Sequence, residues 1–371
     1  MKAAGIILAD GKLGEIDELI RHRTVASVPF GGRYRLVDFA LSNFVNADVM
    51  QVGIITKRNY QSLMDHIGSG KDWDLSRKNG GVIIFPPYGN PFANYHTSHG
   101  NLLEALQSVD EFITKCPEDH IIVTECDSVN VIDYSDVLQQ HEDTNADITV
   151  IYQEMDGELT EKGSLVCDTD EFGRVISGSI VRGDKGVVKA SIGAYVIKRK
   201  LLASLLKEAA SRGNHSFEQD IIINNITSLR VFGYNYDGAY LPINSMEEYY
   251  KYNMELLNYE TRSKVLDSYP IYTKVRDSAP TKFGSSAKVH NSFIADGCEI
   301  EGTVINSILF RGVKVAKGTV IKDSILMQDT MVMENVNLNA VITDKNVTIR
   351  ERQQLSGCSK LPYYIGKNMV V

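Results

Sequence analysis

The chain has 371 residues, of which 43% are hydrophobic and 23% are charged. This composition is that of an ordinary globular protein, and the length is sufficient for two domains with separate cores. The formal net charge of -8 argues against a nucleic acid or an anionic membrane surface as the main partner. No apolar run is long enough to cross a bilayer, and the N-terminus lacks the pattern of a signal peptide, so we expect neither feature.

The five cysteines are odd in number and scattered, and none forms a CxxC pair. Such a distribution is unlike a disulfide framework or a zinc site. We therefore expect reduced thiols in a cytoplasmic protein.

Residues 1–258 alternate short apolar runs with amphipathic stretches, which predicts an α/β domain whose sheet is mixed and mainly parallel. Apolar residues recur at helical spacing over Gly100–Cys116, which predicts an amphipathic helical stretch, and Ser245 with Glu248 forms a capping box at the start of the closing helix. In such sheets ligands bind at the carboxyl ends of strands, so the loops after Ala9 and Glu125 should carry the chemistry. The expected strands are Ala3–Ala9, Met50–Thr56, Val82–Pro86, His120–Glu125, Ala146–Gln153 and Ser191–Lys198.

Residues 285–371 follow a different period, and residues 259–284 are expected to be a linker. The pattern [ND]-[SA]-x-[IL] begins at Asn291, Asn306, Asp323 and Asn339, so that the spacing is 15, 17 and 16 residues. A short repeat with aliphatic residues and glycines predicts a parallel β-solenoid, whose coils stack their apolar positions. An antiparallel β-sandwich is the alternative, but it would show looser spacing and stricter alternation.

Three long strings carry a family resemblance: PFGGRYRLVDFALSN (Pro29–Asn43), WDLSRKNGGVIIFPPYG (Trp73–Gly89) and ASIGAYVI (Ala190–Ile197). With them, essentially the whole chain resembles the bacterial glucose-1-phosphate adenylyltransferase (ADP-glucose pyrophosphorylase) family. The resemblance implies a Rossmann-like nucleotidyltransferase domain followed by a left-handed β-helix. It also implies glycogen biosynthesis, in which ATP and glucose 1-phosphate give ADP-glucose and diphosphate.

The phosphate loop departs from the family pattern GGxGxRL. Of the nucleotide-binding positions, Ala9, Gly11 and Gly100 remain as remnants, whereas Glu15 stands at the position of the family's arginine. This replacement changes the local charge by two units, each worth on the order of a few kcal/mol against a phosphate. A loop glycine is Leu13, and the lysine before the PFGG string is Val25.

The family binds Mg²⁺ through two aspartates, and only one position is kept here. Asp127 matches the first, but Pro242 stands at the second and has no ligand atom in its side chain. The resemblance thus implies Mg²⁺ for the family and argues against it for this chain, although Asp127 is also readily explained as an ordinary strand-end carboxylate.

Three further residues match family positions. Ser191 and Asp220 match sugar-phosphate positions, but an ordinary cap or surface role explains each of them better. Arg33 stands at a basic position of the regulatory sugar-phosphate site and is the effector candidate, with a solvated surface arginine as the alternative.

A degenerate copy of a full-length enzyme suggests a partner that retains the chemistry. The chain resembles the GlgD-type subunits of the family, which assemble with a catalytic subunit and change its activity. We therefore expect a regulatory subunit of a heterotetramer, which self-associates to a dimer or tetramer and has ATP or a sugar phosphate as a candidate effector. The alternative is a weakly active sugar-1-phosphate nucleotidyltransferase that works alone.

Overall fold

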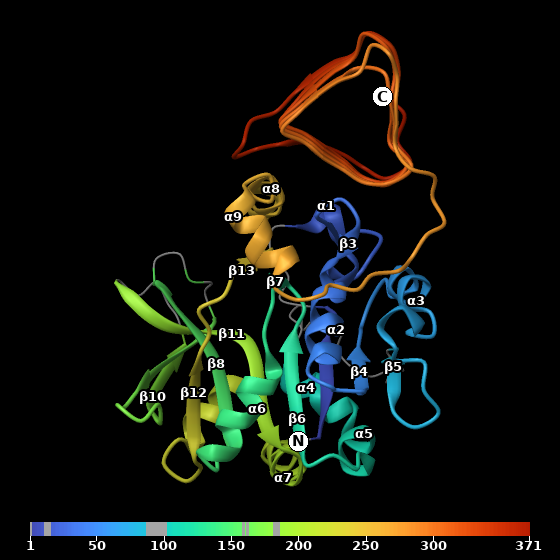
Figure 1. Cartoon of the computed structure of the whole chain (residues 1–371). Helices are drawn as coiled ribbons and strands as arrows, with labels where there is room; N and C mark the ends of the chain where they lie inside the picture. The colour runs from blue at the N-terminus through green and yellow to red at the C-terminus, as the bar shows by residue number, and fades with distance from the viewer. Residues whose placement is uncertain (1, 11–15, 87–101, 158–159, 161–162, 181–185) are drawn as a thin grey trace.

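The computed structural model describes residues 2–10, 16–86, 102–157, 160, 163–180 and 186–371. An N-terminal α/β domain carries a triangular coil of strands at one end (Figure 1). The two parts are joined by α9 (Tyr259–Arg262), the π-helical turn η5 (Ser263–Asp267) and an extended segment.

The N-terminal domain is built on a nine-stranded mixed sheet with the order β10-β9-β11-β6-β1-β4-β5, in which β8 pairs with β11 and β12. β1 pairs in parallel with β4 and β6, and β4 with β5, whereas β11 runs antiparallel to β6 and β8. The six predicted strands are confirmed with ends displaced by a few residues. The strands are β1 (Ala3–Leu8), β4 (Gln51–Ile55), β5 (Gly81–Phe85), β6 (His120–Glu125), β8 (Ile148–Asp156), β9 (Leu165–Thr169), β10 (Val175–Ile180), β11 (Val187–Lys198) and β12 (Val231–Asn235).

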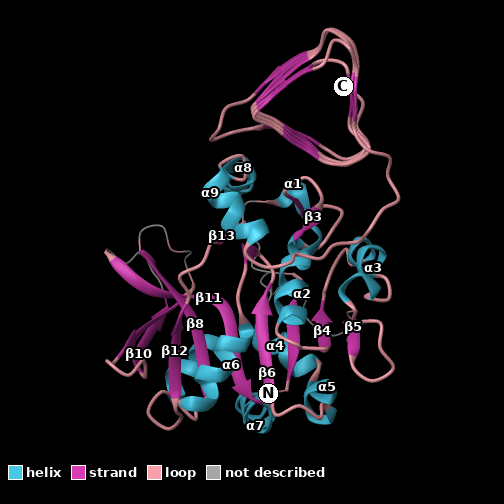
Figure 2. Cartoon of the chain, viewed as in Figure 1, coloured by secondary structure: helices cyan, strands magenta, loops and turns pink. Residues whose placement is uncertain are grey.

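Helices cover both faces of this sheet (Figure 2). One face packs against α4, α5 and α7, and the other against α2, α3 and α6, so that each face has its own apolar core. The helices are α1 (Asp17–Ile20), α2 (Leu36–Asn46), α3 (Gln61–Ile67), α4 (Leu102–Ser108), α5 (Asp110–Lys115), α6 (Tyr134–Asp143), α7 (Arg199–Arg212) and α8 (Met246–Glu255).

The helical stretch predicted over Gly100–Cys116 is confirmed from Leu102 onward, where the described residues begin, but a turn at Val109 divides it into two helices, α4 and α5. Ser108 donates its hydroxyl to the carbonyl of Ala105 at 2.6 Å, and the Val109 amide bonds Leu106 in a tighter turn. Such a side-chain bond competes with the helical ladder. The predicted start of α8 is confirmed, since Ser245 Oγ accepts the Glu248 amide at 3.1 Å.

The C-terminal part is the predicted left-handed β-helix, with three parallel sheets of five short strands each. Its interior is an apolar stack from successive coils, such as Ile300, Val315, Val332 and Ile349. The sheets are β14-β17-β20-β23-β26, β15-β18-β21-β24-β27 and β16-β19-β22-β25-β28. The strands are β14 (Lys282–Phe283), β15 (Lys288–His290), β16 (Phe293–Ile294), β17 (Glu299–Ile300), β18 (Thr303–Ile305), β19 (Ile308–Leu309), β20 (Lys314–Val315), β21 (Val320–Lys322), β22 (Ile325–Leu326), β23 (Met331–Val332), β24 (Asn337–Asn339), β25 (Val341–Thr343), β26 (Thr348–Ile349), β27 (Gln354–Ser356) and β28 (Tyr363–Ile365).

One predicted repeat is out of register. Asn291, Asn306 and Asp323 occupy left-handed corners with φ of 42°, 44° and 46°, but in the next coil that corner is Ala340, with φ of 50°. Strand pairing places Ile325 beside Ile342, which aligns Ala340 rather than Asn339 with Asp323. The sequence pattern misplaced this repeat by one residue because an asparagine happens to precede the alanine.

The β-helix and the N-terminal domain share one apolar core. Ile308, Ile325 and Ile342, from successive coils, belong to the same buried cluster as residues of α2 and α8. The Tyr250 hydroxyl donates to the carbonyl of Asp323 at 2.6 Å across the same contact. The two parts are therefore packed against each other as well as joined by the chain.

Candidate functional site

The carboxyl ends of β1 and β4 lie side by side and form the first candidate region. Ala9 continues β1, and its amide bonds the carbonyl of Ile55 at 2.9 Å. The next residue, Asp10, accepts the Thr56 hydroxyl at 3.1 Å and the backbone amide of Lys57. Burial raises the pKa of Asp10, and these hydrogen bonds oppose the rise. The end of β1 therefore carries a carboxyl group of its own, and this group already accepts the hydroxyl of Thr56 and the amide of Lys57.

Lys57 follows β4 at this strand end, and its side chain is already paired. Its ammonium lies 3.0 Å from the Glu104 carboxylate, and both side chains are partly exposed. An ion pair at the surface is weak, but it still offsets the charge that Lys57 would present to a phosphate. Asp10 was not among the predicted site residues, although a carboxylate directly after a first buried strand was a signal available in the sequence.

Asp127 and Pro242 are brought together by two short antiparallel strands, β7 (Ser128–Asn130) and β13 (Tyr240–Pro242). Pro242 pairs with Ser128, and the Ile243 amide donates to the Asp127 carbonyl at 2.8 Å. Asp127 itself is 6% exposed and lies directly beyond β6. The position predicted to lack a second carboxylate is thus next to the position that keeps one.

The remaining nucleotide positions are only partly placed. Gly11, Leu13, Glu15 and Gly100 lie outside the described residues. Val25 is 2% exposed in the 3-10 turn η1 (Val25–Ser27). It is packed in the core and has no charged group to offer a phosphate.

Ser191 and Asp220 make local backbone contacts. Ser191 Oγ accepts the Gly193 amide at 3.2 Å, where β11 bulges between Ser191 and Ala194. Asp220 accepts the amides of His215 and Ser216 at 3.0 Å each. These bonds hold the local backbone, and the sugar-phosphate role of Ser191 and Asp220 stays a prediction.

Arg33 lies at the rim of a second region, a basic cavity between the N-terminal domain and the β-helix. It is exposed in the turn between β2 (Pro29–Phe30) and β3 (Tyr34–Arg35), with its guanidinium 5.7 Å from the Tyr34 ring centre. The cavity has a volume of about 380 Å³. Its described lining has seven cations and one carboxylate: Arg33, Arg35, Lys274, Arg276, Arg311, Lys345 and Lys367, with Asp65.

The positive charges in this basic cavity affect one another. Burial, reinforced by Arg35 and Arg23, lowers the pKa of Lys345 to about 6, whereas Asp344 acts in the opposite direction. Burial likewise lowers the pKa of Arg35 to about 10. Burial is the main cause of both shifts, and the neighbouring cations add to the shift of Lys345, so a bound anion favours the charged form of Lys345.

The cavity floor is fixed by a buried pair. Asp38, in the first turn of α2, accepts the Arg35 amide at 3.0 Å and lies 2.6 Å from His66 Nε2. Arg35 in turn donates to the carbonyl and the hydroxyl of Ser62 at 2.7 and 3.0 Å. These contacts hold one cation of the cavity rigidly. Apart from Arg33, its residues were missed from the sequence, because Lys274, Arg311 and Lys345 come from segments far from Arg33 and Arg35.

Within the described ranges, no three His, Cys, Asp or Glu side chains are grouped so that they could hold a metal ion. No helix among the same residues is long and apolar enough to cross a membrane.

Comparisons with known proteins agree with the two-part architecture. Residues 4–258 match the nucleotidyl transferase family, and residues 278–358 match the GlmU-like C-terminal hexapeptide family. The chain is 33% identical to the glycogen biosynthesis protein GlgD of Bacillus subtilis (strain 168), over 96% of this chain and 93% of that protein. It is 35% identical to GlgD of Geobacillus stearothermophilus, over 86% and 83%. It is also 32% identical to glucose-1-phosphate adenylyltransferase of Thermosipho africanus (strain TCF52B), over 85% and 77%.

Proposed function

The chain belongs to the glucose-1-phosphate adenylyltransferase family of nucleotidyl transferases, and from this membership we propose that it is a regulatory subunit of that enzyme. Its relatives indicate a role in glycogen biosynthesis. In this proposal the chain acts in the cytoplasm, has a degenerate catalytic centre, and assembles with a catalytic subunit into a heterotetramer.

The observation that carries the proposal is that the strand end with Pro242 lies beside Asp127, because Pro242 pairs with Ser128 and the Ile243 amide donates to the Asp127 carbonyl. Mg²⁺ in nucleotide enzymes is usually bound by one or two carboxylates together with phosphate oxygens. The backbone contact from Ile243 to Asp127 supports the assignment of Pro242 to the second carboxylate position. Because proline has no ligand atom in its side chain, the residues present fit Mg²⁺ poorly, and we derive no metal-dependent step for this chain.

The electrostatics of the β1 and β4 ends support the same conclusion. Asp10 follows β1 directly, and Glu104 is paired with Lys57 after β4, so two carboxyl groups lie at these adjoining strand ends. Preorganised positive groups are the largest contribution to catalysis of this kind, and removing one costs about 10²–10³ in rate. Carboxyl groups in this region should repel the reacting phosphates.

The basic cavity supports a regulatory role. A phosphate-bearing effector, such as a sugar phosphate or ATP, has the charge that the seven cations favour. Because residues of both domains line the cavity, an anion there can influence how the domains pack. We infer that Arg33 and its neighbours receive the effector.

The test is to purify the chain alone and together with the catalytic subunit, and to measure release of diphosphate from ATP and glucose 1-phosphate with Mg²⁺. We expect a stable complex whose rate or effector response differs from that of the catalytic subunit alone. Asp127→Asn in this chain should leave the rate of the complex unchanged. If the chain were instead a weak enzyme working alone, its own rate would be measurable and Asp127→Asn would abolish it.

A further inference from the structure

A buried ion pair joins the β-helix to the N-terminal domain beside the basic cavity. Arg23 Nη2 lies 2.6 and 2.9 Å from the two carboxylate oxygens of Asp344, and the side chains are 3% and 2% exposed. Within the described part of the chain, Arg23 Nη1 is buried without an acceptor. Asp344 is therefore the group that fixes this guanidinium.

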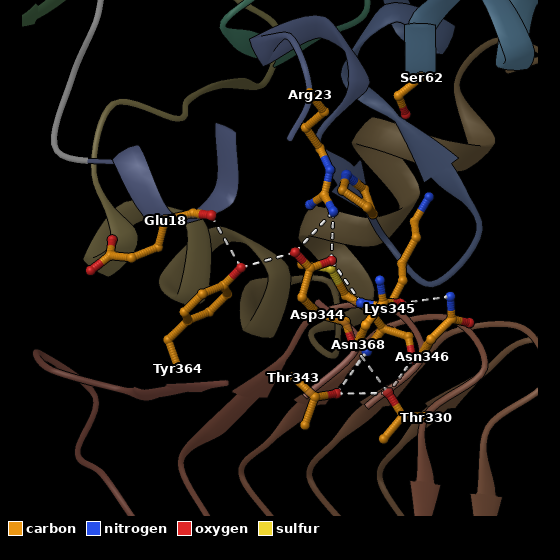
Figure 3. A network of polar contacts seen from close by, with 12 residues as sticks. Glu18, Arg23, Ser62, Thr330, Thr343, Asp344, Lys345, Asn346, Tyr364 and Asn368 are labelled. Atoms are coloured by element: carbon orange, nitrogen blue, oxygen red, sulfur yellow. Dashed lines mark hydrogen bonds and ion pairs between the residues drawn. The ribbon is translucent and has the colours of Figure 1, made fainter. Parts of the chain in front are cut away.

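Asp344 is held in turn by two neighbours. The Tyr364 hydroxyl lies 2.9 Å from Asp344 Oδ2 and 3.1 Å from the carbonyl of Glu18, so it also touches α1 (Figure 3). Burial and the Asp344 charge raise the pKa of Tyr364, which keeps the hydroxyl protonated. The Lys345 amide donates to Asp344 Oδ1 at 2.7 Å. The carboxylate therefore cannot move independently of Lys345.

Arg23 leads directly to the end of β1. It precedes η1, in which the Ala26 amide donates to the carbonyl of Ala9 at 3.0 Å. The segment is held at its start as well, because Asn59 donates to the carbonyls of Ile20 and Arg21 at 3.2 Å. A displacement of Arg23 must therefore either move the backbone at Ala9 or be accommodated by the short segment between Arg23 and Ala26.

Lys345 connects the other end of this chain of contacts to the basic cavity. Its side chain lines the cavity, and burial together with the charges of Arg35, Arg23 and Lys367 lowers its pKa, whereas the charge of Asp344 raises it. The Lys345 charge also contributes to lowering the pKa of His66, on α3, after burial as the main cause. These groups come from both domains, so their mutual repulsion acts across the interface. An anion among them removes that repulsion and favours the packed arrangement.

We propose that the Arg23–Asp344 pair couples occupancy of the basic cavity to the backbone at Ala9, so that a phosphate-type anion held between the domains rigidifies this strand end. Arg23 and Asp344 are positioning residues here, since neither lines the cavity. The coupling must be reciprocal, so a change at the strand end also alters anion affinity. This inference rests on the proposed function of the cavity.

The test uses the full-length chain, inorganic phosphate as the probe, and amide hydrogen exchange at Ala26. In the wild type, saturating phosphate should slow this exchange by at least about fivefold. The double variant Arg23→Met/Asp344→Asn removes the pair without leaving a lone buried charge. We expect it to bind phosphate within about threefold of the wild type but to lose the phosphate-dependent change at Ala26. The matched control is Arg230→Met/Asp147→Asn, which removes an ion pair of 2.8 Å far from the cavity and should keep that change.

Three results would overturn the inference. The change at Ala26 could persist in the double variant, or the control could lose it equally, and in either case the pair is not the connection. Alternatively, the wild type could fail to bind phosphate, which removes the premise of an anion cavity. The stimulation of the catalytic subunit is measured separately, so the failure of the coupling and the failure of the regulatory role are distinguishable.

Discussion

The strand-end region of the N-terminal domain and the basic cavity between the two domains differ in charge. At the end of β1, Asp10 accepts the donors offered by β4, and Lys57 is paired with Glu104. The cavity, by contrast, has seven basic side chains and one carboxylate among its described lining residues, and one of the seven, Arg311, is paired with Asp296. The fold alone does not determine where a phosphate binds. The charges of a few side chains in each region decide which of the two can hold one.

The largest expected difference is in catalysis. With ATP, Mg²⁺ and glucose 1-phosphate, we expect the isolated chain to be at least about a thousandfold slower than a catalytic relative, because a carboxylate and phosphate-facing cations are missing. The measurement is the initial rate of diphosphate release. A rate within tenfold of the catalytic relative would contradict the comparison between the two regions.

Restoring a carboxylate at position 242 tests whether the missing metal ligand alone explains the expected loss of catalysis. Pro242→Asp alone should leave the chain inactive, because Asp10, Leu13, Glu15 and Val25 still oppose the reaction, and groups that act as a unit are not additive. Activity should appear only when several of these positions are changed together. Brisk turnover by the single variant would show that the loop substitutions do not matter.

The next effect concerns pH and the cavity. The pKa of Lys345 is lowered to about 6, so this side chain is mostly neutral above pH 6. An anion bound beside it favours the charged form, so Lys345 takes up a proton when the anion binds. Sulfate affinity, measured by calorimetry, should fall about tenfold between pH 6 and pH 8. Sulfate is used because its own charge stays constant in this range.

Lys345→Met should remove the pH dependence of sulfate binding. Lys367→Met is the matched control, since it removes an exposed cation of the same lining and should weaken binding while the pH dependence is retained. An unchanged pH dependence in Lys345→Met would exclude Lys345 as its source.

Acid should affect stability at the other end of the sheet. His141 lies 2.7 Å from the Thr149 hydroxyl, and burial together with His120 lowers its pKa to about 3. The unfolded chain takes up this proton near pH 6.5, so the stability that the neutral form contributes is complete above pH 6.5. It is lost as the pH falls toward 3, by up to about 1.4 kcal/mol per pH unit for one such group.

Urea unfolding at pH 7.5 and pH 5 measures this loss. His141→Asn should reduce the pH dependence, whereas His290→Asn, at an exposed position of the β-helix, should not. Equal pH dependence in all three proteins would show that other groups dominate the acid response.

The smallest effect is expected at Ser191. Ser191→Ala removes the acceptor of the Gly193 amide and should cost about 1 kcal/mol of unfolding free energy. It should not change stimulation of the catalytic subunit, because the hydroxyl serves the bulge of β11. A changed stimulation with unchanged stability would instead give Ser191 a ligand role.

The sequence predicted the fold well because its signals are local. Buried strands such as His120–Glu125 and the capping box at Ser245 depend on neighbouring residues, and both were placed correctly. The β-helix repeat was also local, although the corner at Ala340 was misplaced by one residue.

The basic cavity was largely missed for a physical reason. Arg35 comes from the first domain and Lys345 from a late coil, and nothing in either segment indicates that they meet. The ion pair of Arg23 with Asp344 joins residues 321 positions apart. Arg33 was singled out only through its family position, since its charge alone is that of an ordinary surface turn.

The shared apolar core has a consequence for synthesis on the ribosome. Residues of α2 and α8 belong to one buried cluster with Ile308, Ile325 and Ile342, which are translated after the whole α/β domain. At roughly 5–20 residues per second, the nascent domain waits on the order of ten seconds for these coils. During that interval its apolar face is open to water and to chaperones. The nascent chain is therefore most exposed to aggregation just before its last coils emerge.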